Sequence, residues 1–198
     1  MFVRAIAVAA LAAATGLAVP ALPGFADASP SLTASAVHTQ ATHRRTVRLH
    51  FEGTTEDVQM QLLTGVDQYD PTIVEVRFDN TGSAVPGEIG VGSVRICVFD
   101  DGRELHEPLL VWEPGRAYAY TVDAEASTMS LPVSEIVLIY DISEGEAGGT
   151  NVTVRAFYDP AVPGTGPIIE PVLTGTLRRT FQTAADVLGG TYLGDERP

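Results

Sequence analysis

A carboxylate and two tyrosines occupy positions that strand alternation would bring to one face of a sheet. Glu107 lies in one strand-like segment, and Tyr118 and Tyr120 share a face of the next segment. Burial among apolar side chains would raise the pKa of an unpaired Glu107, and a tyrosine hydroxyl could donate a hydrogen bond to that carboxylate or to a ligand. The alternation places Leu105, Leu109 and Val111 on the same face as Glu107.

Two roles fit this arrangement equally well. One is a polar anchor or acid/base pair at the wall of an apolar pocket. The other is a structural hydrogen bond between glutamate and tyrosine that fixes the register of the strands. Catalysis, with Glu107 and Tyr120 as acid and base, would need a substrate that the sequence does not identify. The residues therefore favour a binding protein over an enzyme.

Two further polar residues lie nearby. Arg95 alternates onto one face of its strand with Cys97, and an exposed arginine, or one paired with a neighbouring acid, is favoured over one that faces a pocket. His106 falls on the face opposite Glu107, on the side of Trp112. A surface histidine is favoured there over a proton shuttle.

These residues lie in a run of strand-like segments separated by turn residues such as Asp101-Gly102 and Pro114-Gly115. Two more strands are predicted upstream, at Thr46–Phe51 and Ile73–Phe78. The five segments of the run are Val91–Phe99, Arg103–Trp112, Arg116–Asp123, Leu131–Ile142 and Thr150–Tyr158.

Two helical regions are predicted. The first starts with the capping pattern Thr54-x-x-Asp57, is interrupted by Gly65 and ends before Pro71, so one kinked helix or two short ones fit. The second runs from Pro171 to Leu188 with Leu177 and Phe181 on its apolar face, and Pro167 or Pro171 suits its first turn. At about 27 Å, this helix could lie along the whole sheet.

The order of elements predicts an α+β fold: a curved antiparallel sheet of about seven strands that wraps around a long C-terminal helix. Residues 45–190 would form this domain and residues 191–198 a loose tail. Residues 1–28 have a basic start, an apolar run and a small-x-small site, which predict a cleaved secretory signal peptide rather than an anchor. Residues 29–44, rich in Ser, Thr and Ala, would be a flexible lead-in, and the protein would be exported.

Composition excludes several classes of function. The net charge is −13 and the chain has no lysine, which disfavours binding to nucleic acids and anionic membranes. Cys97 is the single cysteine, so no intrachain disulfide can form. The histidines lack metal-ligand spacing, and no cofactor motif is present, so neither a metal nor a cofactor is expected.

The stretch Val91–Asp123 resembles the START-like (SRPBCC, helix-grip) superfamily, in its branch of polyketide cyclase/dehydrase-like proteins. The resemblance rests on Val-Gly-x-x-Arg at Val91, a glycine turn, Glu107 followed by apolar residues, and Tyr-x-Tyr at Tyr118. Thr150–Pro160 and the closing helix also resemble that family. Where many relatives carry a tryptophan early in the first helical region, this chain has polar residues such as Gln59.

The resemblance implies a hydrophobic cavity between the sheet and the long helix. The ligand would be a small apolar molecule, lipid or polyketide-like, held by a binding or transport protein. The alternatives are a cyclase/dehydrase-type enzyme acting in the same cavity, and an acidic protein-interaction module without a ligand. Residues expected to contact the ligand are Glu107, Tyr118, Tyr120, Leu105, Leu109, Leu177 and Phe181, with Arg95 and His106 as weaker candidates.

Overall fold

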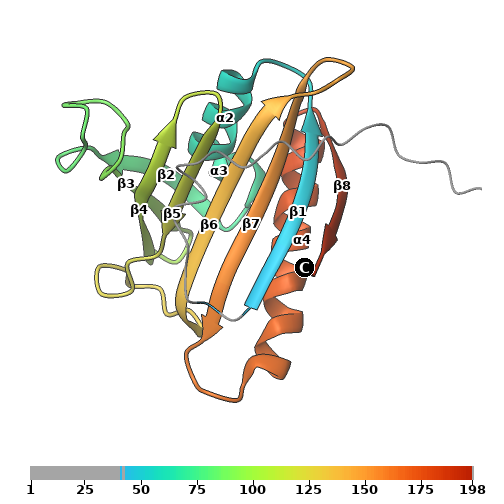
Figure 1. The fold of residues 1–198 in the computed structure, drawn as a ribbon. Coiled ribbons are helices and arrows are strands. Elements are labelled where there is room, and N and C mark those ends of the chain that lie inside the picture. The colour runs from blue at the N-terminus through green and yellow to red at the C-terminus, as the bar shows by residue number, and fades with distance from the viewer. Residues whose placement is uncertain (1–40, 42, 198) are drawn as a thin grey trace, which may run out of the picture.

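The computed structural model describes residue 41 and residues 43–197, and within them all the helices lie on one face of an antiparallel sheet (Figure 1). The predicted signal peptide and most of the lead-in fall outside the described residues. The first elements are β1 (His43–Phe51), α2 (Thr55–Thr64), α3 (Val66–Tyr69) and β2 (Ile73–Asp79). They are followed by β3 (Val94–Phe99), β4 (Glu104–Glu113), β5 (Ala117–Thr121), β6 (Val133–Glu144), β7 (Thr150–Pro160), α4 (Gly166–Val187) and β8 (Gly190–Glu196).

The sheet is a meander of β2 to β7, and β1 and β8 extend it at one edge. Its order is β2-β3-β4-β5-β6-β7-β1-β8, and every neighbouring pair is antiparallel. Consecutive strands from β2 to β7 pair as neighbours, and β1 returns beside β7. Behind the strands, α4 runs along the inner face of the sheet (Figure 1). This confirms the predicted α+β helix-grip fold, with eight strands in place of about seven.

The prediction of a loose tail at residues 191–198 is wrong, because Gly190–Glu196 forms β8 along the edge of β1. Tyr192 donates a hydrogen bond to Asp195 at 2.6 Å, and Arg178 of α4 donates to the same carboxylate at 2.8 Å. A Cβ at Gly190 would lie 2.4 Å from the ring of Phe51, so a glycine is needed for this close approach. The segment shows no clear alternation, and only the free edge of β1 reveals it as a strand.

The long helix begins five residues earlier than predicted, at Gly166 rather than Pro171. Pro167 occupies the first turn, where a missing N–H costs nothing, and Pro171 lies inside the helix. Only the C-terminal half is anchored by fully buried side chains, namely Phe181, Ala184 and Ala185. The N-terminal half therefore rests on the sheet through partly buried contacts.

A bulge in β4 reverses the predicted alternation of its side chains after Leu109. The pairing of β4 with β5 shifts register between Leu109 and Val111, so Val111 turns to the outer face. Trp112 in consequence packs against the inner core. The prediction that Val111 shares a face with Glu107 is therefore wrong, and so is the placement of Trp112 on the side of His106. A bulge inserts one residue and inverts every later side chain in the strand.

Candidate functional site

The inner face of the sheet carries a buried ion pair on β3 and β4. Arg95 of β3 and Glu107 of β4 are direct partners across the two strands, and Arg95 Nε lies 2.7 Å from Glu107 Oε2. Both side chains are almost fully buried, at 3% and 6% exposure. The sequence predicted that Arg95 is either exposed or paired with an acid. The structure shows the ion pair, and Arg95 is buried. The structure therefore places a pair of opposite charges inside the core.

Arg95 joins three elements around this pair. Its Nη1 donates to the carbonyl of Leu63 in α2 at 3.1 Å, and its guanidinium stacks over the ring of Tyr120 at 4.2 Å from the ring centroid. Cys97 donates from Sγ to Glu107 Oε2 at 3.4 Å. A planar guanidinium suits such a site because it can donate in its plane while its face packs on an aromatic ring. We call Arg95, Cys97, Glu107 and Tyr120 the buried polar cluster.

A tyrosine stack extends from the cluster toward α4. The rings of Tyr118 and Tyr140 lie parallel with centroids 4.2 Å apart, and the hydroxyls of Tyr120 and Tyr140 are hydrogen-bonded at 3.2 Å. Phe181 of α4 meets Tyr140 edge-on at 6.1 Å. The buried hydroxyl of Tyr118 has no hydrogen-bond partner among the described residues. An unpaired buried hydroxyl costs about 1–3 kcal/mol, so this group is suited to a polar atom of a ligand or to water.

Burial determines the protonation of these groups. Desolvation raises the pKa of Tyr120 to about 12, and it raises the pKa values of Tyr118 and Tyr140 well above 10. Burial also raises the pKa of the Cys97 thiol. The charge of Arg95 is opposed by burial, but the carboxylate of Glu107 and other neighbours raise the pKa of Arg95 above its ordinary value. At neutral pH the tyrosines are therefore hydrogen-bond donors and not bases.

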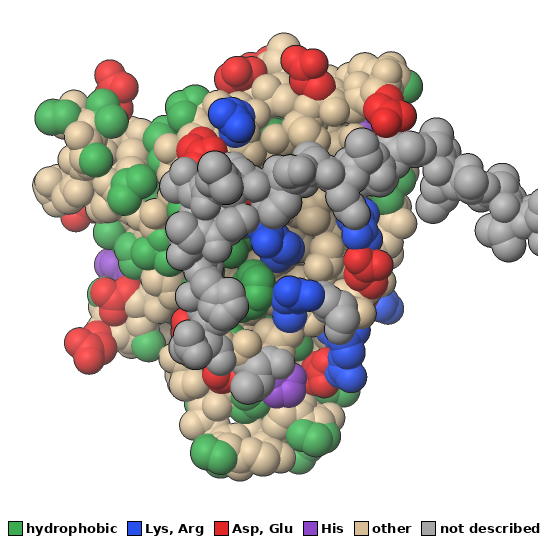
Figure 2. All heavy atoms as spheres, viewed as in Figure 1, with side chains coloured by type: hydrophobic (Ala, Val, Ile, Leu, Met, Phe, Trp, Pro, Cys, Tyr) green, Lys and Arg blue, Asp and Glu red, His purple; other side chains and the backbone are tan. Residues whose placement is uncertain are grey.

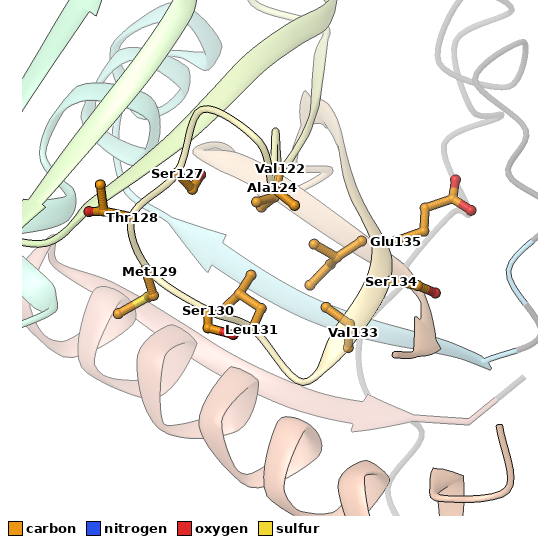
Figure 3. A pocket seen from close by; sticks show the side chains of 11 residues that line it. Val122, Ala124, Ser127, Thr128, Met129, Ser130, Leu131, Val133, Ser134 and Glu135 are labelled. Atoms are coloured by element: carbon orange, nitrogen blue, oxygen red, sulfur yellow. The ribbon is translucent and has the colours of Figure 1, made fainter. Parts of the chain in front are cut away.

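An open pocket of about 200 Å³ lies at the end of these strand rows, enclosed by the loop between β5 and β6 (Figure 3). Ile136 connects it to the inner face, because this residue continues the alternation of Leu138 and Tyr140 and packs against the inner core. Two residues along a strand span about 7 Å, so the pocket begins one side chain away from the tyrosines. The lining residues are Val122, Ala124, Ser127, Thr128, Met129, Ser130, Leu131, Val133, Ser134, Glu135 and Ile136.

The structure gathers most of the predicted ligand contacts, but not around this pocket. Glu107, Tyr120 and Leu109 are buried on the inner face, and Leu105 and Leu177 pack against the same core from partly buried positions. Under the C-terminal half of α4, Phe181 fills the space against Tyr140. None of the predicted contacts lines the pocket. Their role as ligand contacts stays a prediction.

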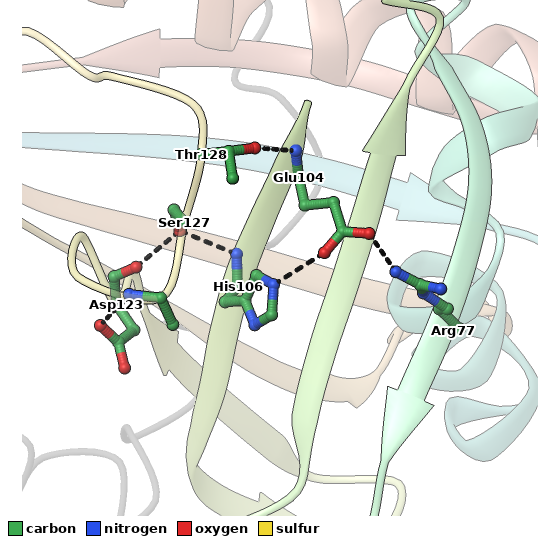
Figure 4. Close-up of polar contacts among 7 residues, drawn as sticks. Arg77, Glu104, His106, Asp123, Ser127 and Thr128 are labelled. Atoms are coloured by element: carbon green, nitrogen blue, oxygen red, sulfur yellow. Dashed lines mark hydrogen bonds and ion pairs between the residues drawn. The ribbon is translucent and has the colours of Figure 1, made fainter. Parts of the chain in front are cut away.

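His106 belongs to a polar network on the opposite side of β4 (Figure 4). Its Nε2 lies 3.1 Å from Glu104 Oε2, and Glu104 also pairs with Arg77 of β2. These two contacts lower the pKa of Glu104. The backbone of His106 donates to Ser127 Oγ at 2.9 Å, and Thr128 Oγ1 accepts from the backbone of Glu104 at 2.8 Å. The network thus holds the pocket loop against β4.

Two important residues were not identified by sequence reasoning. Tyr140 completes the aromatic stack, and its alternation with Leu138 was a usable signal. Gln59 is fully buried: its amide donates to the carbonyls of Glu113 and Ala117, and its oxygen accepts from the backbone of Gly115 at 2.6 Å. A glutamine on a helix gives no sequence signal for such a contact, which arises only when α2 meets the turn between β4 and β5.

Residues 41 and 43–197 contain no group of three or more His, Cys, Asp or Glu side chains arranged to hold a metal ion. In the same part of the chain, no helix combines the length and the apolar character needed to cross a membrane.

The fold and the inner-face site define a helix-grip protein of the START class. A family model described as "Polyketide cyclase / dehydrase and lipid transport" matches residues 60–189, and the chain belongs to this family. That description covers functions built on hydrophobic ligands, either bound and transported or converted by cyclase/dehydrase chemistry. A sequence search of curated proteins finds no match.

Solved structures share the fold at low sequence identity. A START superfamily protein from Mycobacterium smegmatis is similar with a TM-score of 0.57 and 10% identity, over 74% of this chain and 97% of that one. XoxI from Bacillus cereus is similar with a TM-score of 0.53 and 18% identity, over 74% of this chain and 95% of that one. The di-domain ARO/CYC StfQ of the steffimycin biosynthetic pathway is similar with a TM-score of 0.52 and 12% identity, over 74% of this chain and 50% of that one.

Proposed function

We propose that the protein is exported and binds a small hydrophobic ligand at the open end of its sheet–helix grip. The observation that carries the proposal is the pocket beneath the β5–β6 loop, whose lining includes Ile136, a residue that packs against the inner core. Apolar walls supply the affinity for such a ligand, and hydroxyl groups in the lining, such as that of Ser130, would orient it.

The volume of the pocket restricts the ligand. Typical ligand sites measure about 300–1,000 Å³, and this pocket measures about 200 Å³. One ring or a short acyl segment therefore fits. A longer lipid or polyketide would leave part of its length outside the pocket or displace the loop that Ser127 and Thr128 hold on β4.

The chemistry of the cluster favours binding over catalysis. Glu107 already accepts from both Arg95 and Cys97, and Tyr120, with a pKa of about 12, holds its proton at neutral pH. A general base needs a pKa near the working pH and access to the substrate. The cyclase/dehydrase alternative predicts that Glu107→Gln abolishes turnover while ligand affinity is kept; unchanged turnover would eliminate it.

The binding proposal is tested with a pocket-filling variant of the chain from Ser29. Ala124 lines the pocket and is exposed, so Ala124→Trp should fill the pocket without disturbing the core. Displacement of a fluorescent fatty acid should then weaken at least tenfold. Ala147→Trp, at an exposed turn between β6 and β7, is the matched control and should bind as the unmodified chain does. Equal binding by both variants, or no binding by the unmodified chain, contradicts the proposal.

Export is tested separately by expressing the full sequence in a secreting bacterial host. The exported product should begin at Ser29 when its N-terminus is sequenced. A product that stays with the cells and begins at Met1 would contradict export and leave the binding proposal untouched.

A further inference from the structure

The strand β2 is an edge of the sheet that pairs on one side only. It stands first in the strand order, and β3 is its one neighbour among the described strands. Apart from that pairing, no backbone hydrogen bond joins residues 74–79 to another described segment. Val74, near the start of the strand, is 60% exposed. An edge of this kind presents backbone N–H and C=O groups to which a further strand can pair.

Three exposed charges alternate along this edge. Glu75, Arg77 and Asp79 share the outer face, because Val76 and Phe78 between them pack against the inner core. Arg77 donates from Nη2 to Glu104, as Figure 4 shows, and Glu75 has no ion-pair partner among the described residues. Charges on an edge strand usually prevent pairing with other chains. Here their order makes β2 complementary to itself.

The complementarity appears when a second copy of β2 is placed antiparallel with Val76 opposite Val76. Glu75 of each copy then lies opposite Arg77 of the other, on the same face of the joined sheet. Opposite charges in such directly facing positions stabilise a strand pair, and like charges destabilise it. Sliding one copy by two residues in either direction sets Arg77 against Arg77 or Glu75 against Glu75. Charge therefore selects one register.

The loop between β2 and β3 adds apolar surface at the same end of the sheet. Figure 2 shows hydrophobic side chains gathered on this protruding loop, and Val85 and Val91 are 43% and 44% exposed. The loop follows directly after β2, so in the antiparallel arrangement the loop of each copy would lie beside the other copy.

The opposite edge of the sheet, β8, lacks this complementarity. Its acidic residues Asp195 and Glu196 already pair with Arg178 and Arg48 of the same molecule. A second copy would find no unpaired carboxylate there to match an arginine.

We propose that two copies of the chain pair through their β2 edges about a two-fold axis at Val76, which joins the two sheets into one. Such an interface is isologous, since the same residues of both copies form it. Interfaces that bury less than about 1,200 Å² are typical of weak complexes, so we expect a reversible dimer. The proposal does not depend on the proposed ligand binding.

Sedimentation velocity over a range of concentrations of the chain from Ser29 tests the pairing. The unmodified chain should form a reversible dimer. Glu75→Arg and Arg77→Glu should each weaken self-association by about tenfold or more, because two attractive pairs become repulsive. An equimolar mixture of these two variants should associate again, since every substituted side chain then faces an opposite charge. Asp186→Arg, an equal charge change at an exposed position of α4, is the matched control and should dimerise as the unmodified chain does.

A disulfide between copies tests the register. Glu75→Cys and Arg77→Cys are made in separate chains and mixed under oxidising conditions; the native Cys97 is buried. The mixed disulfide should form faster than either symmetric one, because only the mixed pair lies directly opposite and a disulfide needs Cα atoms within about 7 Å. The proposal would be overturned by a chain that stays monomeric at every concentration, by a charge-swap mixture that associates no better than its single variants, or by symmetric disulfides that form as fast as the mixed one.

Discussion

Single residues determine the chemistry of the inner face, and Arg95 shows how. The strand pattern correctly placed Arg95 with Cys97 and placed Glu107 on its own inward row. What local pattern could not show is that β3 and β4 pair in the register that sets Arg95 opposite Glu107. On its own, the carboxylate of Glu107 would have been a candidate acid. In the structure it forms an ion pair with Arg95, which is twelve residues away in the sequence.

We predict that Arg95→Met destabilises the fold by about 3–5 kcal/mol, because it leaves the charge of Glu107 buried and unpaired. Urea unfolding followed by circular dichroism measures the loss. The double variant Arg95→Met/Glu107→Leu should be more stable than the single one, since both charges are then removed. A single variant that loses less than about 1 kcal/mol would show that the pair is not isolated from water.

We also predict that stability falls as the pH rises from 10 to 12. The pKa of Tyr120 is raised by burial to about 12, so the unfolded chain releases this proton first. The stabilising effect is complete below pH 10 and is lost as the pH approaches 12, at about 1.4 kcal/mol per unit of pKa shift. Unfolding free energies measured across this range should fall less steeply in Tyr120→Phe. An identical slope in the variant would contradict the assignment.

At the scale of elements, the sequence predicted the existence and order of β1 to β7 and of both helical regions, because each has a local period, although several bounds differ by two to five residues. Two predictions failed because the pairing of strands, and not the local periodicity of the sequence, decides the structure there. β8 exists because β1 offers a free edge, and the outward turn of Val111 results from a bulge between β4 and β5. Gln59 belongs here as well, since a single side chain joins α2 to the turn between β4 and β5.

We predict that Gln59→Leu destabilises the protein by about 2–4 kcal/mol, because the N–H of Gly115 and the carbonyls of Glu113 and Ala117 each lose a hydrogen bond to Gln59, although Glu113 keeps the one from Arg116 N–H. Gln61→Leu, on the exposed side of the same helix, is the matched control and should change stability by less than about 0.5 kcal/mol. Thermal unfolding of both variants makes the comparison. Equal effects would mean that the turn does not depend on Gln59.

At the scale of the molecule, one continuous core links β1, the first described strand, to the long helix α4. The inner cluster contains residues of β1, α2 and β6 together with Phe181 of α4. We therefore predict a single cooperative transition. Trp112, the only tryptophan, reports on β4 by fluorescence, and circular dichroism reports chiefly on the helices. The two midpoints in urea should coincide; separate midpoints would show that the helices and the sheet unfold independently.

The amino-acid sequence by itself determined the order of elements, the antiparallel sheet and the inward direction of Glu107, Tyr118 and Tyr120. These depend on local periodicity and turn residues, which act over a few positions. Only the tertiary structure decided the pairing of Arg95 with Glu107, the place of β8 and the position of the pocket at the β5–β6 loop. Each of these depends on contacts between segments far apart in the chain, where register and packing, and not local pattern, control which groups meet.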